Sequence, residues 1–362
     1  MNQTDEQEVA RANDDVDVTV VIPTRERRAL VGRALACALW QQDVAVEVIV
    51  VVDGATDDTA AFLTGMQDDR LVVIEHGESR GVAAARNAGI AAARGRYVAF
   101  LDDDDVWAPT KLRQQLDAMA DGSGWSCSAA VVVDEHLVPG RPEHTWSSGD
   151  VADELLERNV VPGGASNVVA DTGLVRSLGG FDPTFSILAD WDLYVRLGQQ
   201  ARLAVVEQPL LGYYVHVGSM AHDAPRAMAE FELIRQKYAE RRAARSLDLA
   251  LGPWLGYLTC WALRAGDRRS AVTLRWQLGR VDGRRARALA MVMVGATWPG
   301  VQRLRDRRAG RRLPATWRAE TETWLSDLRE PSTPRAAGQP SSESLSGARQ
   351  DHAVHGNGPD AH

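Results

Sequence analysis

Four consecutive aspartates, Asp102 to Asp105, form the most unusual group of ionisable side chains in this sequence. Adjacent carboxylates repel one another and destabilise a folded chain unless a cation or hydrogen-bond donors compensate their charge. Mg²⁺ and Mn²⁺ favour oxygen ligands, and Mg²⁺ is often held by one or two carboxylates together with substrate phosphates. We therefore predict a site for Mn²⁺ or Mg²⁺ here. Taken alone, the run would also fit a solvated acidic loop or an N-cap cluster before the next helix.

Other polar residues follow apolar runs that precede these aspartates. Thr24 and Arg25 follow VDVTVVIP, Asp53 ends VEVIVVVD, and Arg80 lies shortly after RLVVIEH. Ligands of an open parallel sheet collect beyond the carboxyl ends of its strands, so we expect these side chains near the aspartates. Arg80 and Arg86 lie where the chain enters a helix, and a planar guanidinium there can reach a diphosphate or a ribose. An exposed helix charge is the alternative interpretation of Arg86.

The elements that would position these residues are short β-branched runs separated by helical segments. The runs VDVTVVIP, VEVIVVVD, RLVVIEH and RYVAFLD are almost wholly apolar, as is typical of strands covered on both faces. RRALVGRALACALWQQ and GVAAARNAGIAAARG have helical spacing, and Gly95 is expected to cap the second helix. The alternation predicts an α/β fold, with a Rossmann-like nucleotide-binding sheet and helices on both faces.

Residues after Asp105 continue this pattern and then become irregular. APTKLRQQLDAMA predicts a helix with Pro109 near its first turn, and WSCSAAVVVD predicts another strand. Residues 135–165, rich in Pro, Gly, His and Trp, predict a loop-dominated insertion that could shape a substrate site. A strand at SNVVAD and helices at TGLVRSLG and DWDLYVRLGQQA are expected to follow.

The last third of the chain differs from the rest in composition. Residues 226–330 are helical in pattern and carry about twice as many basic as acidic residues, which predicts a helical, Arg-rich C-terminal region. Peripheral contact of this region with anionic lipids is a further hypothesis, drawn from Arg-rich segments such as RLRDRRAGRR at 303–312. Residues 1–16, an acidic leader, and 331–362, a polar tail, are predicted to be disordered.

Cysteine usage and hydropathy bear on the compartment. The three cysteines form no CxxC or CxxH pair, which argues against a disulfide framework or a zinc finger. The N-terminus lacks a signal-peptide pattern, and no apolar stretch reaches the roughly 18 residues that a membrane-spanning helix needs. We expect a cytoplasmic protein, with peripheral attachment to the inner membrane face as the accompanying hypothesis. No nucleic-acid partner is expected.

Six blocks of the sequence resemble glycosyltransferase family 2, whose members have the GT-A fold. They are VVIPTRER (20–27), VEVIVVVDGATDDT (46–59), RGVAAARNAGIAAARGRYVAFLDDDDVWAPTKL (80–112), GGFDPTF (179–185), DWDLYVRL (190–197) and YYVHVGSM (213–220). They occur in the family's order and leave the C-terminal third uncovered. The resemblance implies a GT-A catalytic domain at residues 17–225 that uses a nucleoside-diphosphate sugar as donor.

The resemblance also implies roles for the residues at the strand ends. The donor nucleotide would be bound by Thr24, Arg25, Asp53, Arg80 and Arg86. A carboxylate such as Asp53 can accept the N3 proton of uracil or the imino proton of guanine. Family members commonly carry a further acid where this chain has Val52. The base is therefore left open among UDP-, GDP- and dTDP-sugars.

The metal site is assigned in the same way. The family's DxD-type element corresponds to Asp102, Asp103 and Asp104. Asp104 is the expected direct ligand of Mn²⁺ or Mg²⁺, and Asp102 or Asp103 would contact the ribose or metal-bound water. His216 falls where family members often carry a histidine, so it would complete the metal shell or hold the diphosphate.

Asp190 corresponds to the family's general base, which removes the proton of the acceptor hydroxyl. The family's Glu at the preceding position is Ala189 here. Apolar neighbours would raise the pKa of Asp190 and make it a better base, while a helix N-cap is the alternative role. The resemblance implies an inverting transfer, with in-line displacement at the anomeric carbon.

Missing motifs argue against related functions. The membrane helices and QxxRW motif of processive polysaccharide synthases are absent from the sequence, which favours addition of a single sugar. PTRER has no glycine, unlike the GxGTR-like loop of sugar-phosphate nucleotidyltransferases or the GxGxxG of dinucleotide-dependent oxidoreductases. A catalytically silent GT-A scaffold that binds a membrane surface or a protein partner is the alternative from a different class.

Overall fold

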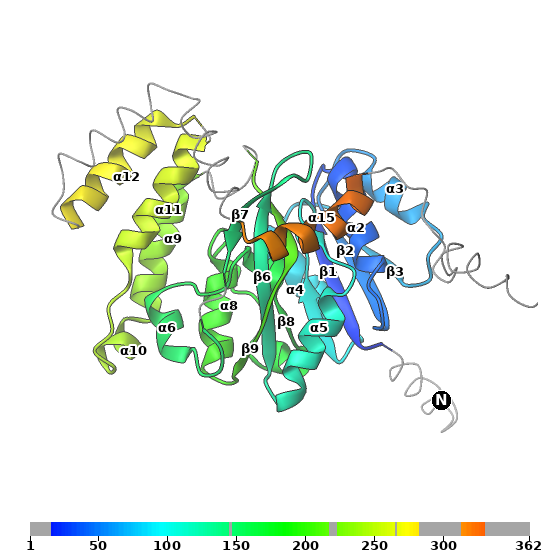
Figure 1. The fold of residues 1–362 in the computed structure, drawn as a ribbon, viewed down its shortest axis with the longest axis horizontal. Helices are drawn as coiled ribbons and strands as arrows, with labels where there is room; N and C mark the ends of the chain where they lie inside the picture. Colours follow the sequence, from blue (N-terminus) through cyan, green and yellow to red (C-terminus); the bar gives the residue numbers. More distant parts are fainter. Residues whose placement is uncertain (1–15, 145–146, 217–222, 265, 282–312, 330–362) are drawn as a thin grey trace, which may run out of the picture. The chain divides into compact units, whose positions relative to one another are not determined.

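The computed structural model describes residues 16–144, 147–216, 223–264, 266–281 and 313–329. Within these residues, nine strands form one sheet (Figure 1) in the order β3-β2-β1-β4-β8-β6-β9-β5, with β7 paired to β6. The strands are β1 (Val18–Thr24), β2 (Val46–Asp53), β3 (Leu71–His76), β4 (Tyr97–Phe100), β5 (Val106–Trp107), β6 (Trp125–Val133), β7 (Pro139–Glu143), β8 (Val169–Asp171) and β9 (Leu203–Tyr214).

The first half of the sheet is parallel, as the sequence predicts. Strand β1 pairs with β2 and β4, so that Val18 lies opposite both Val46 and Tyr97. Every residue of β1 and β2 is buried, because helices cover both faces of these central strands. Full burial of each valine contributes roughly 1.5–3 kcal/mol. Strand β3 lies at the edge of the sheet and is only partly buried.

The second half of the sheet is mixed rather than parallel. Strand β8 is antiparallel to β4 and β6, β9 is parallel to β6, and β5 is antiparallel to β9. Residues 135–165, predicted as a loop-dominated insertion, contain strand β7 and helix α6 (Ala152–Glu157), so that prediction was wrong in part. Strand β7 starts with Pro139 and pairs only with β6, and proline is compatible with such an edge position.

Helices lie on both faces of the sheet. The described helices are α2 (Arg28–Leu39), α3 (Thr59–Thr64), α4 (Val82–Ala92), α5 (Lys111–Ala118), α6, α7 (Thr172–Ser177), α8 (Ala189–Gly198), α9 (Ala224–Lys237), α10 (Ala239–Ala243), α11 (Leu251–Arg264), α12 (Arg268–Val281) and α15 (Ala315–Arg329). Of these, α11 and α12 pack on each other and share a small core with α9. One core contains Val20 with α2, α3, α5 and α15, while the other contains Val21 with α4 and α6 to α9. Alternation of side chains along β1 separates these two cores. The predicted α/β fold with helices on both faces is confirmed.

Gly95 does not cap helix α4, contrary to the sequence prediction. The helix ends with Ala93 at the C-cap, and Gly95 has no positive φ angle. A Cβ at Gly95 would lie 2.5 Å from the backbone nitrogen of Thr19. The glycine therefore permits close approach of this turn to β1, and its N–H donates to Thr19 Oγ1 at 2.8 Å.

The C-terminal region is helical where it is described, as predicted. Helix α9 begins at Ala224, so the predicted domain boundary at residue 225 falls in its first turn. Phe231 of α9 belongs to the same core as Trp191 of α8, and Trp324 of α15 packs in the other core. Among the described residues, no helix combines the length and apolar character needed to cross a bilayer. Apart from Val16, the predicted disordered leader and tail lie outside the described residues, as does the 303–312 segment.

Candidate active site

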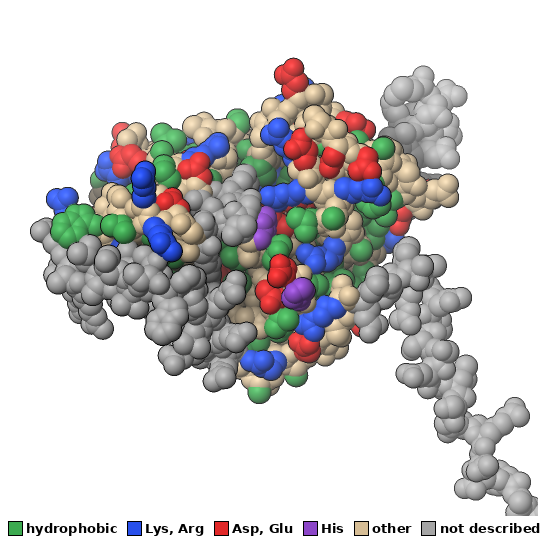
Figure 2. All heavy atoms as spheres, turned by 90° about the horizontal axis from the view of Figure 1, so that it is seen from above, with side chains coloured by type: hydrophobic (Ala, Val, Ile, Leu, Met, Phe, Trp, Pro, Cys, Tyr) green, Lys and Arg blue, Asp and Glu red, His purple; other side chains and the backbone are tan. Residues whose placement is uncertain are grey.

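A cleft of about 500 Å³ opens beyond the carboxyl ends of β1, β2 and β4. It is where the rule for open parallel sheets places a ligand. Figure 2, which views the molecule from above, shows acidic, basic and histidine side chains side by side near the middle of that face. The predicted site residues that line the cleft are Thr24, Arg25, Asp53, Arg86, Asp102, Asp103, Asp104 and Asp190.

The four consecutive aspartates do not all face this cleft. Asp102, Asp103 and Asp104 line it, whereas Asp105 is fully buried and points elsewhere. Asp105 Oδ1 accepts a hydrogen bond from the backbone N–H of Tyr214 at 2.8 Å. Burial, together with Asp104 and Asp102, raises the pKa of Asp105 well above its ordinary value. Asp105 therefore attaches the end of β9 to this turn.

Arg27 and Thr24 hold the acidic turn, residues Asp102 to Asp105, against the end of β1. Arg27 Nη1 donates to both Asp103 Oδ1 and Asp104 Oδ2 at 3.0 Å. Thr24 Oγ1 donates to Asp103 Oδ2 at 2.7 Å. Burial and neighbouring Asp104 raise the pKa of Asp103 to about 7, although Arg27 and Thr24 act in the opposite direction. Sequence reasoning missed Arg27, even though it lies in the same PTRER block as Thr24.

Arg86 is buried under the cleft and is not an exposed helix charge. Its Nη2 lies 2.5 Å from Asp102 Oδ1, and its guanidinium is 5.1 Å from the centre of the Phe181 ring. Burial alone would lower the pKa of Arg86, but Asp102 and Asp190 outweigh this effect and raise it. The positive charge of Arg86 therefore stays fixed between two carboxylates of the cleft.

Asp53 lines the cleft and also fixes the loop that follows β3. Its carboxylate accepts from Ser79 Oγ at 2.8 Å and from the backbone N–H groups of Arg80 and Gly81 at 2.9 Å, and His76 Nδ1 lies 2.8 Å away. Burial opposes ionisation, but these hydrogen bonds prevail and lower the pKa of Asp53. A nucleobase that donates a hydrogen bond to Asp53 would have to share this carboxylate with the loop after β3. The exposed Arg80 is not among the residues that line the cleft.

Asp190 enters the cleft from the first turn of helix α8. The residue at the N-cap is Leu188, and Asp190 Oδ1 accepts from the backbone N–H of Trp191 at 2.7 Å. Burial raises the pKa of Asp190 to about 6, while the nearby charge of Arg86 limits the increase. Gly164 approaches the carboxylate closely, since a Cβ there would lie 3.4 Å from Asp190 Oδ2. A carboxylate with this pKa is suited to accept a proton near neutral pH.

His216 lies beside the acidic turn. Its Nε2 is 2.8 Å from Asp104 Oδ2, and its ring stacks on Tyr214 with centres 4.9 Å apart. A carboxylate oxygen such as Asp104 Oδ2 is a suitable ligand for Mn²⁺ or Mg²⁺, and the adjacent imidazole nitrogen is a further donor at the same place. The described part of the chain groups no three His, Cys, Asp or Glu side chains in an arrangement that could hold a metal ion. A metal would therefore need donor phosphates as its remaining ligands.

The far wall of the cleft was predicted only in part. It is formed by Gly164, Ser186, Ile187, Tyr213 and Arg226. These residues come from a short helical turn, the segment before α8, strand β9 and helix α9. Gly164 lies in the segment 135–165 and Tyr213 in the block at 213–220, whereas Ser186, Ile187 and Arg226 belong to no block that the sequence analysis singled out. Only the packing of α9 on α8 brings Arg226 to this site.

Comparison with known proteins shows which protein family the first part of the chain resembles. Residues 19–167 match the family model described as glycosyl transferase family 2. This segment therefore resembles glycosyltransferase family 2, as the sequence blocks predict. The matched segment contains strands β1 to β4 and the acidic turn, whereas Asp190, His216 and the C-terminal helices lie beyond it.

Two relatives illustrate the likeness in sequence. The succinoglycan biosynthesis protein ExoO of Rhizobium meliloti is 42% identical over 139 residues, which are 38% of this chain and 38% of the relative. The UDP-Glc:alpha-D-GlcNAc-diphosphoundecaprenol beta-1,3-glucosyltransferase WfaP of Escherichia coli is 34% identical over 102 residues, 28% of this chain and 41% of the relative. The chain thus spans about two fifths of the length of these curated relatives.

Solved structures show a more distant likeness. Residues 1–349 of Staphylococcus aureus TarS in complex with UDP align with a TM-score of 0.48 and 17% identity, over 76% of this chain and 90% of TarS 1–349. The mannosyltransferase PcManGT of Pyrobaculum calidifontis, in complex with GDP-Man and Mn²⁺, aligns with a TM-score of 0.47 and 20% identity. That alignment covers 86% of this chain and 84% of PcManGT.

Proposed function

We propose that this chain is an inverting, divalent-metal-dependent glycosyltransferase that moves one sugar from a nucleoside-diphosphate sugar to a hydroxyl acceptor. The observation that carries the proposal is one cleft that contains both an acidic turn and a separate carboxylate with a raised pKa. The acidic turn would bind the metal that stabilises the leaving diphosphate, and Asp190 would deprotonate the attacking hydroxyl. The family match at residues 19–167 supports the role of the acidic turn. The role of Asp190 is supported by the resemblance of the block DWDLYVRL at 190–197.

The donor side would be formed by the ends of β1, β2 and β4. Thr24, Arg25 and Asp53 would contact the nucleoside, and Arg86 would keep Asp102 in place for the ribose. Asp104 and His216 would hold Mn²⁺ or Mg²⁺. When bound, the metal would neutralise charge that develops on the departing diphosphate. Arg27, which bridges two aspartates at 3.0 Å, would add positive charge next to the same phosphates.

The acceptor side would be formed by Asp190 and the far wall of the cleft. Asp190 would take the proton of the acceptor hydroxyl as its oxygen attacks the anomeric carbon from the side opposite the diphosphate. The bond from that carbon to the diphosphate oxygen then breaks, and the configuration inverts. General-base assistance of this kind typically contributes about 10²–10⁴-fold to the rate.

The donor can be identified by ligand-induced thermal stabilisation. UDP-, GDP- and dTDP-sugars are each tested with and without Mn²⁺, because a ligand that binds the folded state raises its apparent stability. We expect one donor class to stabilise the wild type only with metal, and Asp104→Asn to abolish that effect. NMR of the product would then establish the anomer, and a retained configuration would refute inversion.

The acceptor class is proposed from the relatives. WfaP is named for transfer of glucose from UDP-Glc to GlcNAc-diphosphoundecaprenol, and ExoO for succinoglycan biosynthesis. We therefore propose a role in cell-envelope polysaccharide synthesis, with GlcNAc-diphosphoundecaprenol and UDP-glucose as the first pair to test. If Asp104→Asn and Asp190→Asn both leave the cellular function intact, a silent scaffold that binds a membrane or a protein is the better description.

A further inference from the structure

Helix α9 places a buried carboxylate directly behind the acceptor wall of the cleft. Glu230 is only 4% exposed. Its Oε2 accepts from the backbone N–H groups of Ile187 at 2.8 Å and Leu188 at 2.9 Å, and its Oε1 accepts from Ser186 Oγ at 2.7 Å. The backbone N–H of Ser186 lies 3.1 Å from both oxygens. One side chain thus binds three consecutive residues.

These three residues lead directly into the helix that carries Asp190. Leu188 occupies the N-cap position of α8, and its carbonyl accepts the first helical hydrogen bond from Asp192 at 3.0 Å. The side chain of Leu188 makes no capping hydrogen bond, and within the first turn Asp190 accepts only from the backbone N–H of Trp191. Glu230 therefore supplies from another helix the acceptor that the start of α8 lacks locally. Ser186 and Ile187 also line the cleft beside Asp190.

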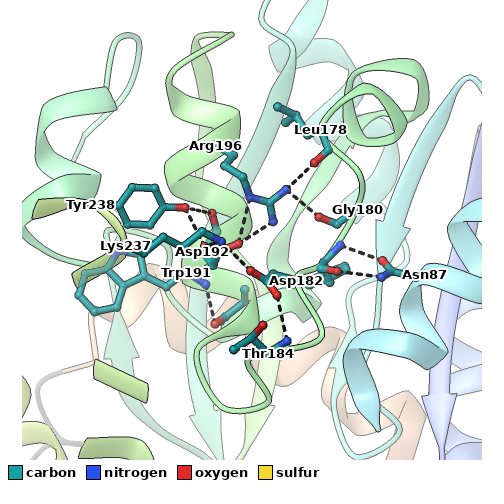
Figure 3. Close-up of polar contacts among 12 residues, drawn as sticks. Asn87, Leu178, Gly180, Asp182, Thr184, Trp191, Asp192, Arg196, Lys237 and Tyr238 are labelled. Carbon is teal, nitrogen blue, oxygen red and sulfur yellow. Dashed lines mark hydrogen bonds and ion pairs between the residues drawn. The ribbon is translucent and has the colours of Figure 1, made fainter. Parts of the chain in front are cut away.

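A second set of contacts holds α9 against α8 (Figure 3). Asp192 is fully buried, and its Oδ1 lies 2.6 Å from Lys237 Nζ and accepts from Tyr238 Oη at 2.7 Å. Its Oδ2 accepts from Arg196 Nη2 at 2.8 Å. Lys237 Nζ also donates to Asp182 Oδ2 at 2.7 Å, in the segment between α7 and α8. Because this network fixes the body of α8, Glu230 acts on an anchored helix and determines the path of the chain that enters it.

We propose that Glu230 is a positioning residue of the transferase, which sets the place of Asp190 through the backbone of Ser186, Ile187 and Leu188. The inference rests on the proposed function, in which Asp190 deprotonates the acceptor. It assigns a catalytic consequence to α9, which lies outside the family match at residues 19–167. A shift of about 1 Å in a reacting group can reduce a rate by about 10²-fold.

The matched pair Glu230→Gln and Glu232→Gln tests this role. Both residues lie on α9, and both substitutions remove one negative charge and an ion pair with an arginine of the same helix, Arg226 or Arg235. Glu232 is exposed, and among the described residues its partners are its helix neighbours Arg235 and Gln236. In Glu230→Gln, one carboxylate oxygen becomes an NH2 group, which donates and cannot accept, so the backbone N–H groups on that side lose their acceptor. The readouts are donor turnover, with water and with added GlcNAc-diphosphoundecaprenol, and Mn²⁺-dependent stabilisation by the nucleoside diphosphate.

We expect Glu230→Gln to lower kcat about 10- to 100-fold while nucleoside-diphosphate binding is unchanged, and Glu232→Gln to match the wild type. Glu230→Asp keeps the charge one methylene further back, so it should retain more activity than the amide. A kcat within twofold of the wild type would overturn the inference, as would a parallel loss of turnover and nucleotide binding. If Glu230→Gln does not fold, Ser186→Ala removes the hydrogen bond from Ser186 Oγ to Glu230. An unchanged kcat in that variant would also overturn the inference.

Failure of the underlying function gives a different result. If Asp190→Asn leaves kcat unchanged, the base assignment is wrong. If Asp190→Asn abolishes turnover but Glu230→Gln does not alter it, only the positioning role is refuted.

Discussion

The raised pKa of Asp190 predicts a specific pH dependence of catalysis. Only the ionised carboxylate can take the acceptor's proton, and burial raises its pKa from 3.8 to about 6. The neighbouring charge of Arg86 keeps the pKa from rising further. The active form should therefore disappear as the pH falls through about 6, well above the range in which an ordinary aspartate is protonated.

The size of the effect follows from the ionised fraction. At pH 5, a group with a pKa of about 6 is roughly one-tenth ionised, whereas a group at 3.8 is more than nine-tenths ionised. We therefore expect kcat/KM at pH 5 to be about a tenth of its value at pH 8, with a tenfold fall for each further pH unit. An unperturbed base would lose less than a tenth of its activity over the same interval.

The assay is donor turnover between pH 4.5 and 8.5 at saturating Mn²⁺, with stability checked at each pH by thermal unfolding. Asp190→Asn provides the control, since its residual activity should lack this ionisation. A wild-type profile that stays level from pH 8 to pH 5 would refute the pKa argument. A fall that persists unchanged in Asp190→Asn would assign the ionisation to another group.

Three further predictions concern stability and ligand binding. Arg86→Met leaves the Asp102 carboxylate without its buried cation. Because the Asp102 side chain is 30% exposed, the loss should be about 2 kcal/mol in urea unfolding, and an unchanged midpoint would contradict the pairing. Gly89→Ala should cost about 1–3 kcal/mol, because its Cβ would lie 2.4 Å from Val21 Cγ1 and push α4 off the sheet. Gly32→Ala, whose Cβ would meet nothing closer than 3.6 Å, should instead stabilise α2 by about 0.5–1 kcal/mol, and equal effects of the two substitutions would count against this packing argument. Chelation of divalent metal should abolish stabilisation by the nucleotide sugar but leave the unfolding temperature of the free chain within a degree or two.

Much of the parallel half could be predicted because its signals are local. Strands β1 and β2 are runs of β-branched residues that are buried throughout, and the polar residues at their ends lie at one edge of the sheet by the geometry of parallel strands. Family blocks added Asp190 and His216, which no spacing rule would have connected with Asp104. The later strands were less accessible, because an edge strand such as β7 depends on its partner rather than on its own composition.

The sequence by itself indicated the resemblance to glycosyltransferase family 2, the run of four aspartates and the groups proposed as base and metal ligands. Tertiary structure alone decided which of these groups face the cleft. Four identical aspartates differ only in orientation: Asp105 is turned inward, where its side chain accepts from the backbone N–H of Tyr214, while Asp104 stays beside His216. Arg27, Arg226 and Glu230 likewise acquire their roles from contacts across the fold. Such contacts depend on how helices pack on a sheet, and a linear pattern of residue types does not encode those distances.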